Sequence, residues 1–269
     1  MKVRKFWLKN AKNSIYTLAD LSAVKTFING PKGLGYSNTV TVTQYGEFLS
    51  SDPKQNFNQF NGEVEFVQNT NELKYAAYQT FINFLNEGGL KLYYQIPSVS
   101  NDTYYADVEV SSIEKTEIGV DNVMRCPIVL QLLSRWKGTE VTVTGSGTTY
   151  TLQNNGHMPV GFEITITGAM SNPYFTLEQD SEVYGAAKFE ETFDEVYVNS
   201  NDGMQQVKLS QGGAYVANPL AYQDLSISNG GIYVTFVKLE TGTSTLTVGY
   251  DSGAISSVEI KYTPLYRSV

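Results

Sequence analysis

The sequence predicts a mainly β protein with one helix, and three observations support this fold class. Aromatic residues make up 13% of the 269-residue chain, including 19 Tyr, and Tyr suits the half-buried surface of a pleated sheet. Residues 90–136 contain three strand-length runs separated by turn residues. A strong helical spacing of apolar residues is found in one stretch, 72–87.

The last of the three runs shows most clearly why a sheet is expected. Apolar side chains recur at nearly every second position, which is the period of a strand with one buried face. They are Met124, Cys126, Ile128, Leu130, Leu132 and Trp136. Cys126 is the only cysteine and cannot form an internal disulfide, so its place on this face predicts a small core residue rather than a reactive thiol.

The chain before residue 72 predicts short strands joined by turns. Residues 27–36 are rich in glycine but lack the full fingerprint of a phosphate-binding loop, so a structural loop is predicted there. Residues 46–61 are polar and irregular and predict a loop that lies over the surface. Strands are expected at 40–43 and 63–67, and residues 3–9 and 14–18 are expected to form short strands or a leading arm.

The predicted helix, 72–87, has recognisable start and stop signals. Asn69, Thr70 and Asn71 offer a capping side chain, and Gly88-Gly89 stands where a left-handed C-cap is usual. Its apolar positions predict one face packed on the sheet. These positions are Leu73, Ala76, Ala77, Phe81, Phe84 and Leu85.

A β-hairpin is predicted from about residue 110 to residue 127. Its tip, Glu114–Asn122, has charged flanks, with Ile118 and Val120 near the turn. An isolated pair of strands is marginally stable in water, so a long hairpin that overhangs its sheet needs a surface to lie against. The sequence therefore predicts that this tip is a contact device.

The pattern changes after Lys137-Gly138, which predicts two domains, 1–137 and 138–269. The second part shows many short strands divided by turn signals, the pattern of an all-β sandwich. The strands expected there are 141–143, 162–167, 174–177, 196–198, 207–209, 232–239, 245–248 and 258–262. Charge changes at the same place. Residues 1–138 hold 14 Lys+Arg and 13 Asp+Glu, a net of +1, whereas residues 139–269 hold 5 and 14, a net of −9.

No grouping of residues predicts catalysis, a cofactor or a metal. His157 is the only histidine and has no partner in the sequence for a triad or a zinc site. An acidic cluster is predicted to be a solvated face rather than a glycosidase pair, and it comprises Glu190, Glu191, Asp194 and Glu195. Neither specific nucleic-acid binding nor membrane insertion is expected, because no basic motif and no long apolar run is present.

Several short motifs follow one another in a fixed order in the first half. They are Pro31-x-Gly33-Leu34-Gly35, Val64-Glu65-Phe66, Leu92-x-Tyr94, Tyr105-Ala106-Asp107-Val108 and Lys115-Thr116-Glu117, before a strand that ends at Arg135-Trp136. This order resembles the distal tail proteins (Dit) of siphophages and prophages of Gram-positive bacteria. The resemblance covers about residues 20–137. In the second half it rests on the sandwich pattern and on the closing residues 262–266.

The resemblance implies an amino-terminal β-sandwich with one helix and a projecting hairpin, and a galectin-like carboxyl-terminal β-sandwich. It also implies a homohexameric ring at the distal end of a phage tail, made in the host cytoplasm, with a lumen for DNA. The expected partners are the tail tube protein, the tail-tip protein, and receptor-binding or baseplate proteins. The expected subunit-interface residues are Pro31, Leu34, Ile113, Lys115, Glu117, Ile118 and Val120.

Two other functions fit parts of the sequence. A carbohydrate-binding module of a surface or secreted protein would explain the aromatic content and the sandwich. It is disfavoured because the basic amino terminus lacks an apolar export segment and because Trp7 and Trp136 lie outside the second domain. A glycoside hydrolase would rest on acidic residues alone. The leading interpretation is a structural virion protein that is not an enzyme.

Overall fold

The computed structural model describes residues 4–18, 26–45, 48–95, 97, 102–215, 222–223 and 236–269. The chain folds into two compact units. The first contains residues 1–138 and 266–269, and the second contains residues 139–265. Gly138 therefore ends the first unit, and the last four residues return to it.

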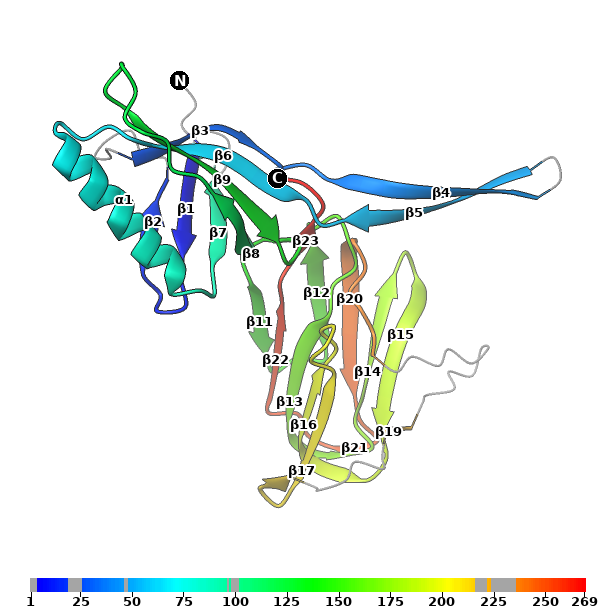
Figure 1. The fold of residues 1–269 in the computed structure, drawn as a ribbon. Helices are drawn as coiled ribbons and strands as arrows, with labels where there is room; N and C mark the ends of the chain where they lie inside the picture. The colour runs from blue at the N-terminus through cyan, green and yellow to red at the C-terminus, as the bar shows by residue number, and fades with distance from the viewer. Residues whose placement is uncertain are drawn as a thin grey trace. The chain divides into compact units, whose positions relative to one another are not determined.

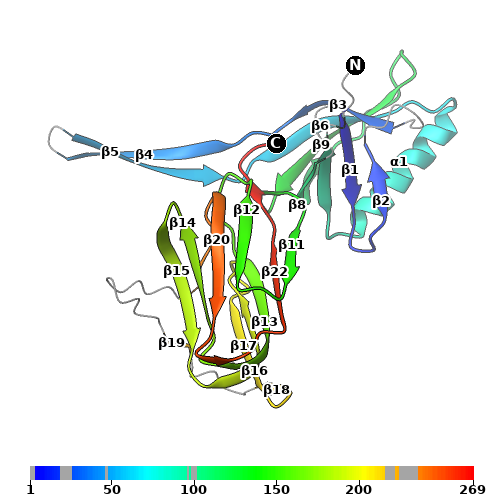
Figure 2. The same cartoon turned by 180° about the vertical axis from the view of Figure 1, so that it is seen from behind.

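The first unit is a curled antiparallel sheet with one helix (Figures 1 and 2). Its strand order is β2-β1-β7-β8-β9-β6-β3, and β4 and β5 form a separate two-stranded sheet. The elements are Lys5–Lys9 (β1), Ile15–Thr17 (β2), Thr26–Lys32 (β3), Ser37–Tyr45 (β4), Phe48–Asn56 (β5), Gln59–Phe66 (β6), Asn71–Asn86 (α1), Lys91–Gln95 (β7), Thr103–Ile113 (β8), Met124–Leu132 (β9) and Trp136–Lys137 (β10).

The core of the first unit lies between the two halves of this sheet. Phe6 on β1 and Phe60 on β6 are buried, and their ring centroids are 5.6 Å apart. The predicted alternation in β9 is confirmed, because every second residue from Met124 to Leu132 is buried. Trp136 on β10 is buried as well. The sequence pattern of β9 thus reports its position in the middle of the sheet.

Helix α1 has the predicted ends. The Thr70 side chain accepts a hydrogen bond from Leu73 N, and Gly88 and Gly89 both have positive φ. Part of the predicted apolar face is wrong, because Leu73 and Ala76 are exposed and Lys74 is buried instead. The buried apolar contacts of α1 are made by its second half, through Phe81, Phe84 and Leu85.

The predicted surface loop at 46–61 is also wrong, because these residues contain β5 and the start of β6. Each residue of β4 pairs with one of β5, from Ser37↔Asn56 to Tyr45↔Phe48. The alternation is clear in β4 but hidden in β5, where the sequence SSDPKQN is polar and contains Pro53. Backbone pairing with β4 is what makes this polar segment a strand.

The second unit is a sandwich of two antiparallel sheets. One has the order β11-β22-β13-β16-β17-β18, with β21 beside β13, and the other has the order β12-β20-β14-β15-β19. The strands are Val141–Gly145 (β11), Thr149–Asn154 (β12), Phe162–Ser171 (β13), Tyr174–Gln179 (β14), Glu182–Phe189 (β15), Thr192–Asn199 (β16), Gln206–Gln211 (β17), Ala214–Tyr215 (β18), Tyr222–Gln223 (β19), Gly242–Gly249 (β20), Ser252–Gly253 (β21) and Ser257–Tyr262 (β22). Strand β23, Leu265–Tyr266, pairs with β10 in the other large sheet.

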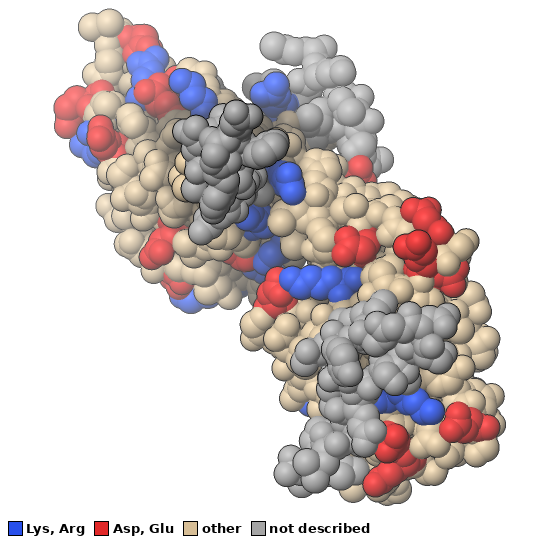
Figure 3. Space-filling view, turned by 90° about the vertical axis from the view of Figure 1, so that its right-hand side faces the viewer, with Lys and Arg blue, Asp and Glu red and all other residues tan. Residues whose placement is uncertain are grey.

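The two sheets of the second unit enclose one apolar core, in which the ring centroids of Phe162 on β13 and Phe175 on β14 are 6.0 Å apart. Strands β12 and β15 were not predicted, and part of the predicted strand at 232–239 lies outside the described residues. On the face that Figure 3 shows, the acidic side chains of the second unit lie in several separate groups. The mainly β fold class is confirmed.

Candidate subunit-contact surfaces

The loop between β8 and β9, residues 114–123, is called the tip below, and it is fastened to α1. The Nζ of Lys74 donates a hydrogen bond to Asn122 Oδ1 at 2.8 Å, and Asn71 Oδ1 lies 3.4 Å from the same ammonium. Lys74 is completely buried, and the hydrogen bonds to these oxygens compensate for the hydration that its ammonium has lost. The first turn of the helix therefore holds the end of the tip.

A second set of contacts joins the tip to the exposed side of α1. The Tyr75 hydroxyl donates to Glu117 Oε2 at 2.9 Å, and Lys115 Nζ lies 4.9 Å from the Tyr75 ring centroid. Lys115 Nζ is also 3.1 Å from Glu117 Oε1. The hydrogen bonds from Tyr75 and then Lys115 lower the pKa of the Glu117 carboxyl below its ordinary value.

Arg125, at the start of β9, links the tip to β6. Its guanidinium lies 3.3 Å from Glu65 and 3.4 Å from Glu63, and it forms an ion pair with Asp121 on the tip. The hydrogen bond from Arg125 is the main cause of the lowered pKa of Asp121. The tip therefore has ordered charge contacts within its own subunit.

The predicted interface residues lie in different surroundings. Leu34, Ile113 and Ile118 are partly buried and pack against the core of the first unit. Val120 is fully exposed at the end of the tip. Pro31 lies on β3, close in sequence to the base of the β4–β5 hairpin. The structure brings Lys115, Glu117 and Ile118 together at the tip, and their role in an interface stays a prediction.

The β4–β5 hairpin, called the arm below, is the more extended overhang (Figures 1 and 2). Its two strands pair with each other and with no other strand of the described chain. Val40 and Val42 lie on the same face of β4 and are 54% and 58% exposed. An apolar face on an unsupported two-stranded ribbon is typical of a segment that packs against another molecule.

The base of the arm is firmly attached to the first unit. Asn58 Nδ2 donates to Gly35 O at 2.6 Å, Ser37 Oγ donates to Asn58 Oδ1 at 2.8 Å, and Leu132 N donates to Asn58 O at 3.1 Å. Gly33 has a φ of 97°, and a Cβ there would stand 2.0 Å from Gln59 O, so glycine is required at this entry to the arm. The structural loop predicted over 27–36 is thus wrong for residues 27–32, which belong to β3 and pair with β6, and only residues 33–36 form a loop that leads into β4.

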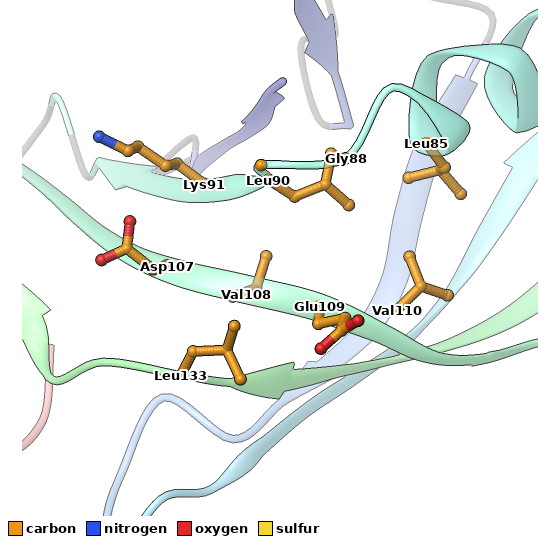
Figure 4. A pocket seen from close by; sticks show the side chains of 10 residues that line it. Leu85, Gly88, Leu90, Lys91, Asp107, Val108, Glu109, Val110 and Leu133 are labelled. Carbon is orange, nitrogen blue, oxygen red and sulfur yellow. The ribbon is translucent and has the colours of Figure 1, made fainter. Parts of the chain in front are cut away.

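A groove of about 550 Å³ lies between the end of α1 and β8. Figure 4 shows apolar side chains from both elements turned toward it, with charged groups on its rim. Its apolar lining comes from Leu85, Leu90, Val108, Val110 and Leu133, and its charged lining from Lys91, Asp107 and Glu109. The sequence did not predict this groove. It forms because β7 pairs with β8 only as far as Asp107, whereas β8 continues to Ile113.

Asp107 is the best-fixed charge on the rim of the groove. Lys137 Nζ lies 2.6 Å from its Oδ2. Burial alone would raise the pKa of Asp107, but hydrogen bonds from Lys137 and Ser134, with the positive charge of Lys137 and Lys91, lower it on balance. Asp107 is therefore ionised at neutral pH and keeps the rim polar.

The groups that would carry chemistry are not assembled for it. Within the described residues, no three His, Cys, Asp or Glu side chains lie in an arrangement that could hold a metal. Burial raises the pKa of the Cys126 thiol to about 11, in keeping with a core role. No helix among the described residues has the length and apolar character needed to cross a bilayer.

Residues 5–133 match the family model of the distal tail protein, N-terminal domain. The first unit is therefore a domain of the distal tail protein family. This family comprises structural proteins of phage tails, which agrees with the predicted resemblance. No curated protein sequence matches the chain.

Solved structures extend the likeness of fold to both units. A chain of the phage P2 baseplate, in its activated conformation with calcium, is 14% identical with a TM-score of 0.53, over 99% of this chain and 100% of that one. The Dit protein of phage SPP1, described as a hub of the adsorption apparatus in phages that infect Gram-positive bacteria, is 12% identical with a TM-score of 0.62. That match covers 96% of this chain and 98% of SPP1 Dit.

Proposed function

We propose that this chain is the hub at the distal end of a phage tail, and that six copies close into a ring through their first units. The match of residues 5–133 to the distal tail protein domain carries the proposal. A closed ring requires two different surfaces on each subunit, one of which contacts the next subunit while the other receives the previous one. The arm is a better candidate than the tip for the surface that contacts the next subunit.

The arm supports this role because its strands have no other cover within the described chain. Each strand has nine residues, which gives a length of about 30 Å. Docking would remove Val40 and Val42 from water, and complete burial of an exposed valine side chain stabilises a complex by about 1.5 kcal/mol or more. Val120 on the tip, with Pro31 and Leu34 near the base of the arm, would add smaller contacts.

The ring would join the tail tube protein to the tail-tip protein and to receptor-binding or baseplate proteins, with DNA passing through its lumen. Residues 1–138 carry a net charge of +1, which supports this arrangement because a strongly basic lumen would hold phosphates and slow their passage. The protein would be made in the host cytoplasm and act in the virion. It would need no catalytic residue, cofactor or metal.

The second unit is proposed to be a galectin-like sandwich that the ring carries toward baseplate partners. Its two stacked antiparallel sheets are compatible with that fold. Residues 139–269 carry a net charge of −9, which suits a soluble, outward-facing domain and disfavours contact with phosphate polymers. The fold by itself implies no sugar binding.

The mass of the particle tests the proposal. Light scattering on the purified full-length chain, over a wide range of concentrations, should approach six times 29.8 kDa. Electron microscopy of the same sample should show rings with a central opening. A chain that remains monomeric at the highest concentration, or a particle without a lumen, would contradict the proposed ring.

A further inference from the structure

A small hollow lies at the base of the arm, within the first unit. Its volume is about 10 Å³, which is room for roughly one oxygen-sized group. The end of the chain helps to form it. The carboxyl terminus lies beside the base of the arm in both views (Figures 1 and 2), and Val269 N donates to Leu34 O at 3.1 Å. The side chains that matter most in its lining are those of Tyr36, Phe57, Arg135, Trp136 and Arg267.

Trp136 brings an unused hydrogen-bond donor to this hollow. Its side chain is 1% exposed, and its indole Nε1 is buried without a hydrogen-bond partner among the described residues. An indole N–H can donate but cannot accept, and a buried donor that stays unpaired destabilises a fold. Such a group in a folded protein therefore calls for an acceptor.

Arg135 and Arg267 add positive charge to the same hollow. No carboxylate of the described residues pairs with Arg135, and its guanidinium lies 4.9 Å from the centroid of the Phe57 ring. Burial, and then the positive charge of Arg267, lower the pKa of Arg135 below its ordinary value. The subunit itself therefore leaves this charge without compensation.

Other polar groups beside the hollow are already satisfied. Asn58 Nδ2 donates to Gly35 O at 2.6 Å, and its Oδ1 accepts from Ser37 Oγ at 2.8 Å. Ser134 Oγ accepts from Asp107 N at 2.9 Å. What the hollow still offers is hydrogen-bond donors and positive charge. A group that fits must therefore bring oxygen acceptors and negative charge.

The mouth of the hollow favours an anion that is carried by a protein. Tyr36 and Phe57 are each 50% exposed there, and aromatic and arginine side chains together are typical of the centre of a protein–protein contact. The hollow has no room for a tetrahedral phosphate. A planar carboxylate, in contrast, can place one oxygen inside while its second oxygen stays with the guanidinium groups.

We propose that this hollow anchors an acidic side chain of a partner protein. One carboxylate oxygen accepts from the Trp136 indole N–H, and the carboxylate pairs with Arg135 and Arg267. Tyr36 and Phe57 cover the apolar residues that flank the acidic one. The site belongs to a single subunit and does not depend on the proposed ring.

The fluorescence of Trp136 tests this site in the full-length chain. Trp7→Phe leaves Trp136 as the one tryptophan, and a phenylalanine can keep the stacking of residue 7 on Tyr93, whose ring centroid is 5.2 Å away. Acetyl-glutamate amide, exchanged for chloride at constant ionic strength, should change the Trp136 emission to saturation. Acetyl-glutamine amide has the same shape without the charge and should leave it unchanged. The absence of a saturable response to the charged probe would overturn the site.

Three variants in the Trp7→Phe background show whether the guanidinium groups hold the probe. Arg267→Gln should weaken the binding of acetyl-glutamate amide by about tenfold, because charge-assisted hydrogen bonds are lost. Arg135→Lys keeps the charge but loses the planar fork, and it should also weaken binding. Arg4→Gln, at an exposed arginine that does not line the hollow, is the matched control and should have no effect. Equal affinities in all three variants would contradict the proposed contacts.

Two further probes decide what carries the anion. Acetyl-Leu-Glu-Leu-amide should bind about threefold more tightly than acetyl-glutamate amide, because its leucines can contact Tyr36 and Phe57. Equal affinity would assign the hollow to free carboxylate ions and reject a protein partner. Inorganic phosphate should not compete, and saturable competition by phosphate would reject the carboxylate. A particle of ring mass without any response to the probes would overturn this anchor and leave the proposed ring standing, whereas a monomer that responds would do the reverse.

Discussion

The tip and the arm are both overhanging ends of hairpins in the first unit, but they differ in what holds them. The tip is bound to its own subunit through the buried Lys74, through Tyr75 and through Arg125. The arm is held at its base, and beyond it Val40 and Val42 remain exposed. The comparison favours the arm over the tip as the contact surface of the proposed ring, because the subunit itself leaves the arm uncovered.

Shortening the arm should have the largest effect on assembly. Thr39 and Lys54 are directly opposite, so a two-residue Asn-Gly turn can join them in place of residues 40–53. We expect loss of the ring, measured as a fall in mass to that of a monomer. The folded subunit should keep its stability to within about 0.5 kcal/mol, because no core residue is removed. A ring of unchanged mass would contradict the role given to the arm.

Removing the buried ammonium of Lys74 should loosen the tip and destabilise the subunit. Lys74→Ala leaves Asn122 unpaired and opens a cavity, so we expect a loss of about 2–4 kcal/mol in the free energy of unfolding, measured with urea. Lys74→Met keeps most of the buried stem and should lose less. Lys12→Ala, at a 68% exposed side chain, serves as the surface control. Equal losses for positions 74 and 12 would show that the tip is not anchored there.

The exposed end of the tip can be tested without disturbing its anchors. Val120→Glu should leave the free energy of unfolding within about 0.5 kcal/mol of wild type, because this side chain has no cover. If Val120 contributes to the ring, the concentration at which the ring dissociates should rise by about tenfold, which corresponds to roughly 1.4 kcal/mol. An unchanged dissociation midpoint would remove Val120 from the interface.

Acid should release the tip before it affects the arm. The pKa of Glu117 is lowered from 4.5 by hydrogen bonds from Tyr75 and then Lys115, and the pKa of Asp121 is lowered from 3.8 mainly by the hydrogen bond from Arg125. A lowered pKa in the folded state gives stabilisation that is present above the ordinary value and is lost as pH falls through the folded pKa. Hydrogen exchange at residues 114–123, corrected for its intrinsic pH dependence, should therefore rise below about pH 4. Glu117→Gln should remove part of this dependence, and an identical profile would contradict it.

Strand β9, helix α1 and strand β5 differ in how far their structure could be predicted from the sequence. The buried positions of β9, from Met124 to Leu132, could be predicted because each carries an apolar residue at a period of two. The ends of α1 could be predicted because Thr70 and Gly88 are local signals. Strand β5 could not, because its polar residues and Pro53 lack that period, and its pairing with β4 is the sole reason for its conformation.

The sequence by itself determined the mainly β class, helix α1, the core strand β9 and the distal-tail resemblance, since each depends on local spacing or short motifs. Only the tertiary structure decided which hairpin stays uncovered, that Lys74 rather than Leu73 is buried, and that a groove lies between the end of α1 and β8. These features depend on which strand ends first and which side chain finds a partner. Such contacts join residues far apart in the chain, and no local pattern contains them.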